Sequence, residues 1–387
     1  MTDTPPLQPF HQRLPDAAGV LSWIHIGDLH MTKAGEQNHL DLVSIVEEIN
    51  RAFTGSLAFV YIPGDVADDG SVTEYRVVRE ALDRLQVPWC SIIGDHDVHE
   101  KSFTNYLAFM AHAKHYSFQV GSVRFVALNA FDIPDPGSFC LLDEQLDWLE
   151  EDLRQAEQEK QSIVLLLHCY PTDLKQGGDR LRRLVERPSV RLIDMGHTHY
   201  NELANDGRTL YTATRSTGQI EEGPVGFSVT NIDGQVISWK FLALNELPSV
   251  VITSPADERF ITDAAMKGHI ADDGVLIRAK AWGKTEIKNA VATLEGQLVQ
   301  LSQIAESNVW QGELHRSSLP DGVCSLTVSV EDAHGQTAED SIRLVLGASA
   351  YNSPSRSERD QDNAVAAWPE RGLLATQLGP NKNGRKW

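Results

Sequence analysis

Short apolar runs recur along the first half of the chain, and each leads within two residues into Gly, Asp or His. Each run has the length of a β-strand. Continuous runs of this kind are typical of strands that are buried on both faces of a sheet. The predicted strands are Val20–Ile26, Leu57–Ile62, Trp89–Ile93, Ile163–Leu167 and Val190–Met195.

Helical periodicity separates several of these runs. Apolar residues recur at intervals of three and four positions, as on the buried face of an amphipathic helix. The alternation of strand and helix predicts a layered α/β domain, in which ligands bind at the carboxyl ends of the strands. The helical faces comprise Leu42, Ile45, Val46, Ile49 and Phe53; Tyr75, Val78, Leu82 and Leu85; and Leu142, Leu146, Leu149, Leu153 and Ala156.

The pattern changes after about Leu247, where short strands follow one another with turn signals between them. Such a series predicts a β-sandwich. Its expected strands are Val251–Thr253, Val275–Trp282, Ala290–Leu294, Val323–Val330 and Ser341–Leu346. We therefore divide the chain into an N-terminal extension (1–19), an α/β domain (20–247), a β-sandwich (248–347) and a C-terminal tail (348–387).

The tail begins like a linker, because Ser, Pro, Asn and charged residues dominate its first part. Apolar residues return further on, and the tail carries six basic and four acidic residues. Two interpretations stay open: a disordered tail, or a segment that docks back on the acidic body. The apolar positions are Trp368, Leu373, Leu374, Leu378 and Trp387.

Composition narrows the function classes. The 387 residues carry a net charge of −20, which argues against binding to extended nucleic acid or to an anionic membrane surface. No signal peptide or spanning apolar segment is recognisable, so we expect a cytoplasmic protein. The four cysteines are scattered and form no CxxC pair, so we expect buried free thiols, including Cys169 beside His168.

Potential metal ligands cluster where the predicted strands end. Asp and His are usual donors for hard and borderline divalent cations. In an extended segment, residues i and i+2 point to the same side, so Asp28 and His30 can reach one ion. Preceding glycines allow a sharp turn and a close approach. The cluster comprises Asp28, His30, Asp65, Asp95, His96, Asp97, His168, His197 and His199.

The motifs stand in the order DLH, GDVAD, GDHD, a lone His168 and GHTH. This series resembles the pattern of the calcineurin-like metallophosphoesterases and covers roughly residues 20–245. The segment from Gly64 to Asp97 most resembles the class III cyclic-nucleotide phosphodiesterase branch. The resemblance implies a four-layer αββα sandwich that binds two metal ions at one edge.

The resemblance also implies a role for each residue. The expected ions are divalent or mixed-valence, with Mn, Fe and Zn as open choices. A hydroxide that bridges the two ions would attack phosphorus. The implied roles are Asp28, His30 and His199 on the first metal; Asp95, His168 and His197 on the second; Asp65 between the two; His96 near the phosphate and leaving group; Asp97 orienting His96; and Asp68 orienting a metal ligand.

One position departs from the family pattern. Asp95 stands where the family has Asn, so Asp28, Asp65 and Asp95 bring three carboxylates to the site. The extra charge should strengthen metal binding and weaken phosphate binding. We expect a preference for diesters or for a more charged metal such as Fe³⁺, and a weakened site is the alternative.

These observations predict a binuclear metal-dependent phosphodiesterase that acts on cyclic nucleotides or another small phosphodiester. A phosphomonoesterase acting on nucleotides or small phosphorylated metabolites, and a non-catalytic binding protein with a degenerate metal site, are the alternatives. The C-terminal strands resemble immunoglobulin-like or fibronectin-like modules. Two interpretations stay open for this part: a packing domain or one for homo-oligomerisation, or a module that binds a glycan or protein or shapes the rim of the active site. Six further residues lie near the motifs and are either substrate contacts or ordinary surface or loop residues. They are His99, Asn129, Tyr170, Arg180, Arg182 and Arg183.

Overall fold

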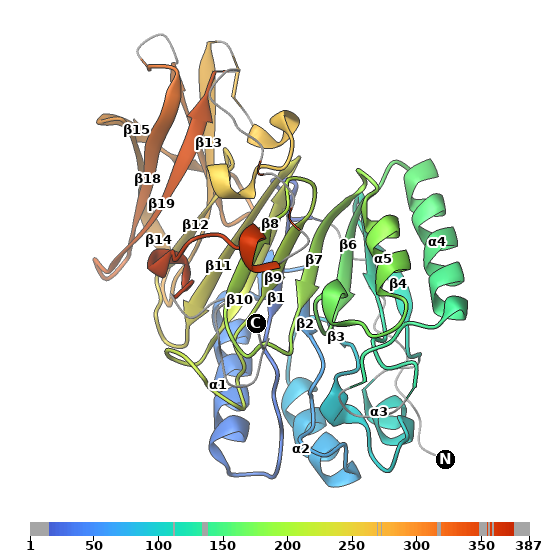
Figure 1. Ribbon diagram of the computed structural model, residues 1–387. Coiled ribbons are helices and arrows are strands. Elements are labelled where there is room, and N and C mark those ends of the chain that lie inside the picture. The colour runs from blue at the N-terminus through green and yellow to red at the C-terminus, as the bar shows by residue number, and fades with distance from the viewer. Residues whose placement is uncertain are drawn as a thin grey trace.

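The computed structural model describes residues 15–374, apart from 111–112, 134–137, 269, 272, 316–318, 348–353, 355–356 and 358–359 (Figure 1). The proposed extension up to residue 14 and the tail residues Leu378 and Trp387 lie outside this range. Within it, the chain forms four β-sheets with helices on two sides of the first pair.

Two mixed sheets form the first part of the molecule. Strands β1, β2 and β3 run parallel in the first sheet, and β5, β6, β7 and β9 run parallel in the second. In spatial order, the first sheet consists of β11 (Val236–Ala243), β10 (Gly226–Asp233), β1 (Val20–His25), β2 (Phe59–Ile62) and β3 (Trp89–Ser91). The second consists of β4 (Tyr116–Val120), β5 (Val123–Ala127), β6 (Ser162–Leu167), β7 (Val190–Met195), β9 (Leu210–Ala213) and β8 (Glu202–Asn205).

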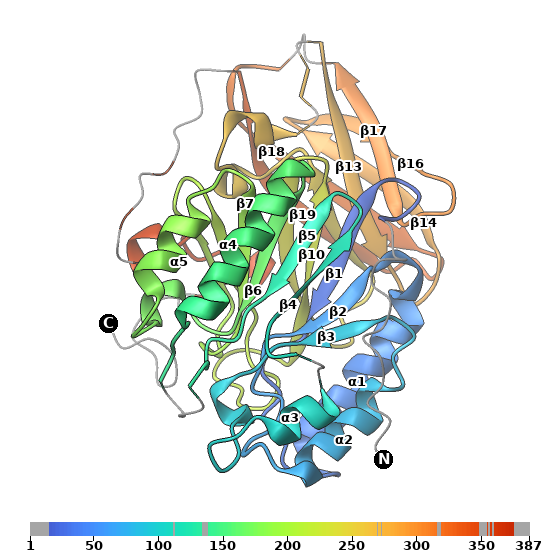
Figure 2. The ribbon, with the colours of Figure 1, turned by 90° about the vertical axis from the view of Figure 1, so that its right-hand side faces the viewer.

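Helices cover the outer faces of these sheets. Helices α1 and α2 lie on the first sheet, and α4 and α5 lie on the second (Figure 2). The helices are α1 (Gln37–Ala52), α2 (Val72–Leu82), α3 (Thr104–Phe109), α4 (Asp143–Gln158) and α5 (Gly178–Val185). Short 3₁₀ turns cover Thr54–Ser56, Asp95–Asp97, Pro171–Asp173, Glu258–Phe260, Ala264–Lys267, Asp360–Asn363 and Pro369–Arg371.

The alternation of side chains along each strand produces the layers. Trp23, Phe59 and Val164 point into the core between the two sheets. Their neighbours Ile24 and Val60 belong to the core that includes the helices. Because both faces of these strands are buried, most of their residues are apolar, as the sequence pattern predicted. The mixed α/β organisation is confirmed, with two sheets between two helical layers.

Strands β10 and β11 were not predicted. Both are buried along their whole length, although they contain Ser228, Thr230 and Lys240. Tertiary partners satisfy such groups; the hydroxyl of Ser228, for example, lies 2.6 Å from that of Thr214. A buried strand with polar side chains leaves no continuous apolar run in the sequence.

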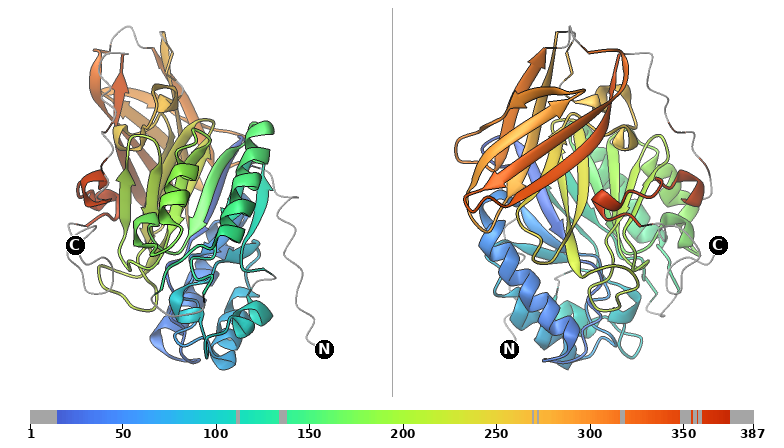
Figure 3. Two further views of the ribbon diagram at one scale, coloured as in Figure 1. Left: turned by 45° about the vertical axis from the view of Figure 1, so that its right-hand side comes forward. Right: turned by 90° about the vertical axis from the view of Figure 1, so that its left-hand side faces the viewer.

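The last third of the described chain is all-β, as predicted. Its two sheets are antiparallel and enclose a separate apolar core that includes Ile277, Ala292 and Leu326 (Figure 3). One sheet consists of β12 (Ser249–Ser254), β13 (Gly274–Trp282), β17 (Val309–His315) and β16 (Ser302–Gln303). The other consists of β15 (Gln297–Gln300), β14 (Ile287–Leu294), β18 (Gly322–Asp332) and β19 (Thr337–Leu346).

Buried ion pairs join the all-β part to the α/β part. The ammonium of Lys280 lies 2.7 Å from a carboxylate oxygen of Asp16, and the guanidinium of Arg278 lies 2.7 Å from Asp233. Paired charges of this kind are costly to separate, because each would be left without a partner away from water. Separating the two parts would therefore leave these buried charges unpaired.

Two simpler expectations concern composition. All four cysteines are unpaired and buried, as predicted. Among the described helices, none combines the length and the apolar character that crossing a lipid bilayer requires.

Candidate metal centre

The predicted ligands meet at one edge of the paired sheets. They follow β1, β2, β3, β6 and β7, and the strands within each set run parallel, so their carboxyl ends lie side by side. The donors form two groups with one member in common, Asp65, and the donor atoms within each group lie within 4.8 Å of one another. The first donor group is Asp28, His30, Asp65 and His199, and the second donor group is Asp65, Asp95, His168 and His197.

The first donor group is buried. The Nε2 atoms of His30 and His199 lie 2.9 Å apart. The Nε2 atom of His199 lies 3.5 Å from Asp28 Oδ2, and that of His30 lies 3.6 Å from Asp65 Oδ2. All four side chains are at most 5% exposed. Two ring nitrogens and two carboxylates that converge in this way form a suitable cage for a cation.

The second donor group is more open. The Nε2 atom of His168 lies 3.3 Å from Asp95 Oδ1 and 3.5 Å from Asp65 Oδ2. The Nδ1 atom of His197 lies 3.4 Å from the same Asp95 oxygen. The side chain of His168 is fully buried, whereas those of Asp95 and His197 are 15% and 22% exposed. Solvent can therefore reach this side of the centre.

The hydrogen bonding around His168 requires a cation. Its Nδ1 donates to the carbonyl oxygen of Pro63 at 2.7 Å, so in the neutral ring the lone pair of Nε2 faces two carboxylates. Although burial would lower it, Asp65 and Asp95 raise the pKa of His168 well above its usual value. A proton or a metal ion must occupy this position, and the donor set suits a divalent metal.

Two further observations fit a bound cation. The Oδ1 atom of Asp28 is buried and has no hydrogen-bond partner among the described residues. Burial and Asp95 would raise the pKa of Asp65, but His168 and His30 lower it to about 2. Asp65 is therefore ionised at neutral pH and can serve both donor groups.

The backbone is strained where it presents these side chains. His30, Asp65, His197 and His199 have φ values of 40°, 48°, 66° and 62°, in the left-handed region that L-residues rarely adopt. Glycine makes room for them, since a Cβ atom on Gly94 would lie 2.1 Å from Asp65 Oδ1. Strain of this kind persists where the surrounding structure holds a functional geometry.

His96 stands at the open side of the centre. Its side chain is 40% exposed, and its Nδ1 donates to the carbonyl oxygen of Asp68 at 2.7 Å. This bond fixes the tautomer and leaves Nε2 for another partner. The carboxylate of Asp68 lies 3.5 Å from Nδ1 of His30, so Asp68 contacts both a donor-group histidine and His96.

Asp97 has other contacts than the expected one to the His96 ring. Its carboxylate accepts hydrogen bonds from the backbone N–H groups of Gly94 and Ala67 and from the hydroxyl of Tyr75. Burial and the charge of Asp65 raise the pKa of Asp97 to about 7. We therefore correct its role: Asp97 ties the loop of Asp65 to the loop of Asp95.

The six residues that the sequence analysis considered as substrate contacts lie in different environments. Arg180 pairs with Asp147 and Glu150 on α4. Asn129 is fully buried and accepts from the backbone N–H of Phe131. Tyr170 is buried, Arg182 and Arg183 lie on α5, and the Nδ1 of His99 donates to the carbonyl oxygen of Asp69.

Supporting residues were missed in the sequence. Asn38 donates to the backbone oxygen of His30, and the hydroxyl of Ser216 donates to that of Asp28. Gln219 lies 3.5 Å from a carboxylate oxygen of Asp68. These residues belong to no motif, because they bond to backbone atoms or act from segments that only folding brings near.

Comparison with known proteins agrees with this geometry. The calcineurin-like phosphoesterase family profile matches residues 22–201, the segment that carries both donor groups. Residues 22–201 form a calcineurin-like phosphoesterase domain. The match supports a metal-dependent phosphoester hydrolase, and the two donor groups provide a site for metal ions.

Three relatives of this domain are named as phosphodiesterases. A probable cyclic nucleotide phosphodiesterase from Synechococcus sp. is 27% identical over 175 residues, which span 42% of this chain and 66% of that protein. A 3',5'-cyclic-nucleotide phosphodiesterase from Nostoc sp. is 26% identical over 46% of this chain and 71% of its own length. A probable glycerophosphodiester phosphodiesterase from Arcobacter nitrofigilis has the same identity and coverage.

Among solved structures, a dimetal phosphatase from Danio rerio is 15% identical, with a TM-score of 0.47. The alignment covers 69% of this chain and 97% of that one.

Proposed function

We propose that this protein hydrolyses small phosphodiesters in a metal-dependent reaction, with cyclic nucleotides as the first substrates to test. The observation that carries the proposal is the pair of donor groups that share Asp65 beside the half-exposed His96. The names of the relatives support a diester as the substrate. The net charge of −20 favours a small substrate over a polynucleotide.

The proposed division of ligands follows the two donor groups. Bound metal ions supply positive charge for the phosphoryl oxygens and acidify a water molecule. Their identity, from among Mn, Fe and Zn, belongs to the proposal. Asp28, His30 and His199 would hold one ion, Asp95, His168 and His197 the other, and Asp65 both.

His96 is the proposed proton donor to the leaving group. Its Nδ1 is engaged by the carbonyl oxygen of Asp68, so Nε2 is the atom that can hold a proton toward the solvent side. A positioned acid of this kind typically contributes about 10²–10⁴-fold to a rate. Asp68 positions His96 through its backbone and His30 through its carboxylate.

The decisive experiment measures hydrolysis of bis(p-nitrophenyl) phosphate by the full chain, stripped of metal and then supplied with Mn²⁺. We expect Mn²⁺-dependent turnover that falls by about 10²–10⁴-fold in His96→Gln while Mn²⁺ binding is retained. His99→Gln is the matched control, because Nδ1 of His99 donates to a backbone carbonyl in the same way from outside the donor groups. Absence of turnover with Mn²⁺ bound would refute the proposal, and faster hydrolysis of p-nitrophenyl phosphate would replace it with a monoesterase.

The preference for diesters is proposed to come from Asp95. Two divalent ions would carry four positive charges, of which Asp28, Asp65 and Asp95 neutralise three and a bridging hydroxide the fourth. A site without net positive charge disfavours a monoester, which carries nearly two negative charges, more than a diester, which carries one.

Asp95→Asn tests this charge argument. A unit charge at 4 Å contributes on the order of 4 kcal/mol at an effective dielectric constant of about 20, so inorganic phosphate should inhibit the variant at least about tenfold more strongly. Asp69→Asn removes the same charge from outside the donor groups and should leave inhibition unchanged. Equal phosphate inhibition of Asp95→Asn and the parent would disprove the argument.

The fold of the all-β part, its oligomeric state and the cellular location are further proposals. The partition of strands supports an immunoglobulin-like fold, because β12, β13 and β17 share one sheet and β14, β18 and β19 the other. Homo-oligomerisation through this part and a cytoplasmic location stay predictions.

A further inference from the structure

The C-terminal segment Asp360–Leu374 crosses back over the α/β part of the molecule (Figure 3). The backbone N–H of Val365 donates to the carbonyl oxygen of Leu203 on β8, and Val365, Trp368 and Leu373 belong to the core between the two sheets. The Arg259 guanidinium stacks on the Trp368 ring, 3.1 Å from its centroid. This segment is therefore part of the folded body.

Arg371 anchors the segment between the two halves of the molecule. Its side chain is 1% exposed, donates to the carbonyl oxygen of Trp239 on β11 and lies 2.7 Å from Asp340 on β19. A guanidinium buried with such partners is costly to displace. The anchor fixes the position of the next peptide group, whose carbonyl belongs to Gly372.

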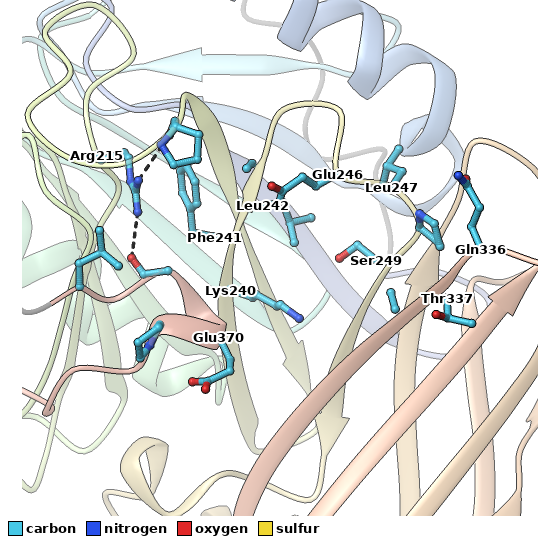
Figure 4. Close-up of a pocket in the computed structure, with 17 residues that line it drawn as sticks. Arg215, Lys240, Phe241, Leu242, Glu246, Leu247, Ser249, Gln336, Thr337 and Glu370 are labelled. Carbon is cyan, nitrogen blue, oxygen red and sulfur yellow. Dashed lines mark hydrogen bonds between the residues drawn. The ribbon is translucent and has the colours of Figure 1, made fainter.

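The Gly372 carbonyl contacts residues that flank the metal centre. It accepts hydrogen bonds from Nδ2 of Asn201 and from Nη2 of Arg215, both at 3.0 Å. Arg215 and Phe241 line a cavity of about 610 Å³ (Figure 4), and the Arg215 guanidinium lies over the Phe241 ring, 4.2 Å from its centroid. Arg215 is 2% exposed, and its Nη1 donates to the carbonyl oxygen of Glu222.

Arg215 and Asn201 lead directly to the first donor group. Asn201 follows His199 by two residues, and its side-chain oxygen accepts from the backbone N–H of Arg215. The residues after Arg215 bind the backbone next to the donors. Ser216 Oγ, Thr217 N and Gly218 N all donate to the carbonyl oxygen of Asp28, and Ser216 N donates to that of His199.

We propose that Gly372 and Arg215 are positioning residues for the first donor group. The C-terminal segment supplies a carbonyl oxygen that holds Arg215 and Asn201, and these residues orient the loops of Asp28 and His199. The proposal rests on the proposed function only in taking this group as a metal site. No comparable contact from the segment reaches the second donor group among the described residues.

The geometry of Gly372 offers a small change with a defined effect. Its φ is +81°, and a Cβ atom there would lie 2.7 Å from Cβ of Phe241 and 3.1 Å from Nδ2 of Asn201. Gly372→Ala therefore displaces this peptide from Asn201. Arg215→Lys keeps the positive charge. The lysine ammonium lacks the planar guanidinium whose two Nη atoms donate to the carbonyl oxygens of Gly372 and Glu222.

The experiment measures Mn²⁺ binding to the metal-free full chain by isothermal titration calorimetry. His199→Ala and His168→Ala identify the binding steps of the first and second donor groups. We expect Gly372→Ala and Arg215→Lys to weaken the first-group step by about 10–100-fold and to leave the second-group step unchanged. Val365→Ala is the control, because it weakens the packing of the same segment at a point distant in sequence from the Gly372 carbonyl. It should lower the melting temperature and leave the Mn²⁺ affinity of both steps unchanged.

Two results would overturn the proposal. One is parent-like Mn²⁺ binding at both steps in Gly372→Ala and Arg215→Lys. The other is equal weakening of both steps in these variants and in Val365→Ala, which indicates a purely structural role. Arg215→Lys decides alone if Gly372→Ala does not fold. A parent that binds two Mn²⁺ ions without turnover would refute the proposed function but leave this measurement valid.

Discussion

The two donor groups use the same residue types in different surroundings. The first is buried and is held by the loop after β9, which the C-terminal segment supports. The second is partly open to solvent and is held by Asp97 and Tyr75 beneath its loops. The comparison indicates a division of labour, in which the first group fixes an ion and the second meets the substrate.

The groups also differ in protonation. Burial and the neighbouring His30 lower the pKa of His199 to about 4, although Asp28 opposes this shift. The carboxylates around His168 raise its pKa in spite of burial. A metal ion that enters the second group therefore displaces the proton of His168. In the first group His199 holds no proton at neutral pH, and His30, whose pKa burial lowers but Asp68 and Asp65 raise, is the histidine that can hold one.

The largest effect is expected from removing the residue that the groups share. Asp65→Asn leaves a neutral amide in both groups, so binding of both Mn²⁺ ions should weaken. Loss of several kcal/mol of charge stabilisation corresponds to a fall in turnover on the order of 10³-fold. Metal content after dialysis and turnover of bis(p-nitrophenyl) phosphate measure the effect. Retention of both ions would show that Asp65 is not shared.

A smaller effect on stability should come from the support of the second group. In Asp97→Asn, the amide N–H₂ faces backbone donors that now lack an acceptor. The expected loss is about 1–3 kcal/mol of unfolding free energy in the metal-free protein. Tyr75→Phe removes one of these hydrogen bonds and should cost about 1 kcal/mol. Thermal unfolding compares the three proteins, and equal midpoints would rule out this role.

The pH dependence of metal binding sharpens the comparison of protonation. Protons and metal ions compete for His168, so affinity at the second group should rise by about tenfold per pH unit below the pKa of His168. Because that pKa is raised above its usual value, the rise should continue above pH 6.5. Calorimetry in buffers of different ionisation enthalpy counts the protons released. A second-group affinity that is constant from pH 6 to 8 would contradict this expectation.

The smallest effect concerns the aromatic wall of the second group. The Phe139 ring lies edge-on to His197, with centroids 4.8 Å apart. Phe139→Leu should weaken the second-group step by about 0.5–1.5 kcal/mol, the usual contribution of such a ring pair. Phe118→Leu alters an aromatic contact in the core between the sheets and should leave Mn²⁺ binding unchanged. Identical affinities for Phe139→Leu and the parent would refute the contact's importance.

The sequence was most informative where both faces of a strand are buried. The runs that became β1, β2, β3, β6 and β7 are mostly apolar, so the pattern predicted these strands and drew attention to the polar residues that follow them. Strands such as β10 and β11 carry polar side chains that are satisfied by distant partners, and no local pattern revealed them. The same applies to β15, β16 and β17, where polar and apolar positions mix.

The sequence by itself determined which residues can bind metal, because the chemistry of Asp and His and their place after strands are local properties. Only the tertiary structure decided which donors share a group, which group is buried, and that Asp97 supports loops. It also decided that a carbonyl 173 residues beyond His199 bonds to the frame of the site, at Gly372. These features depend on distances between segments far apart in the chain, which packing alone sets.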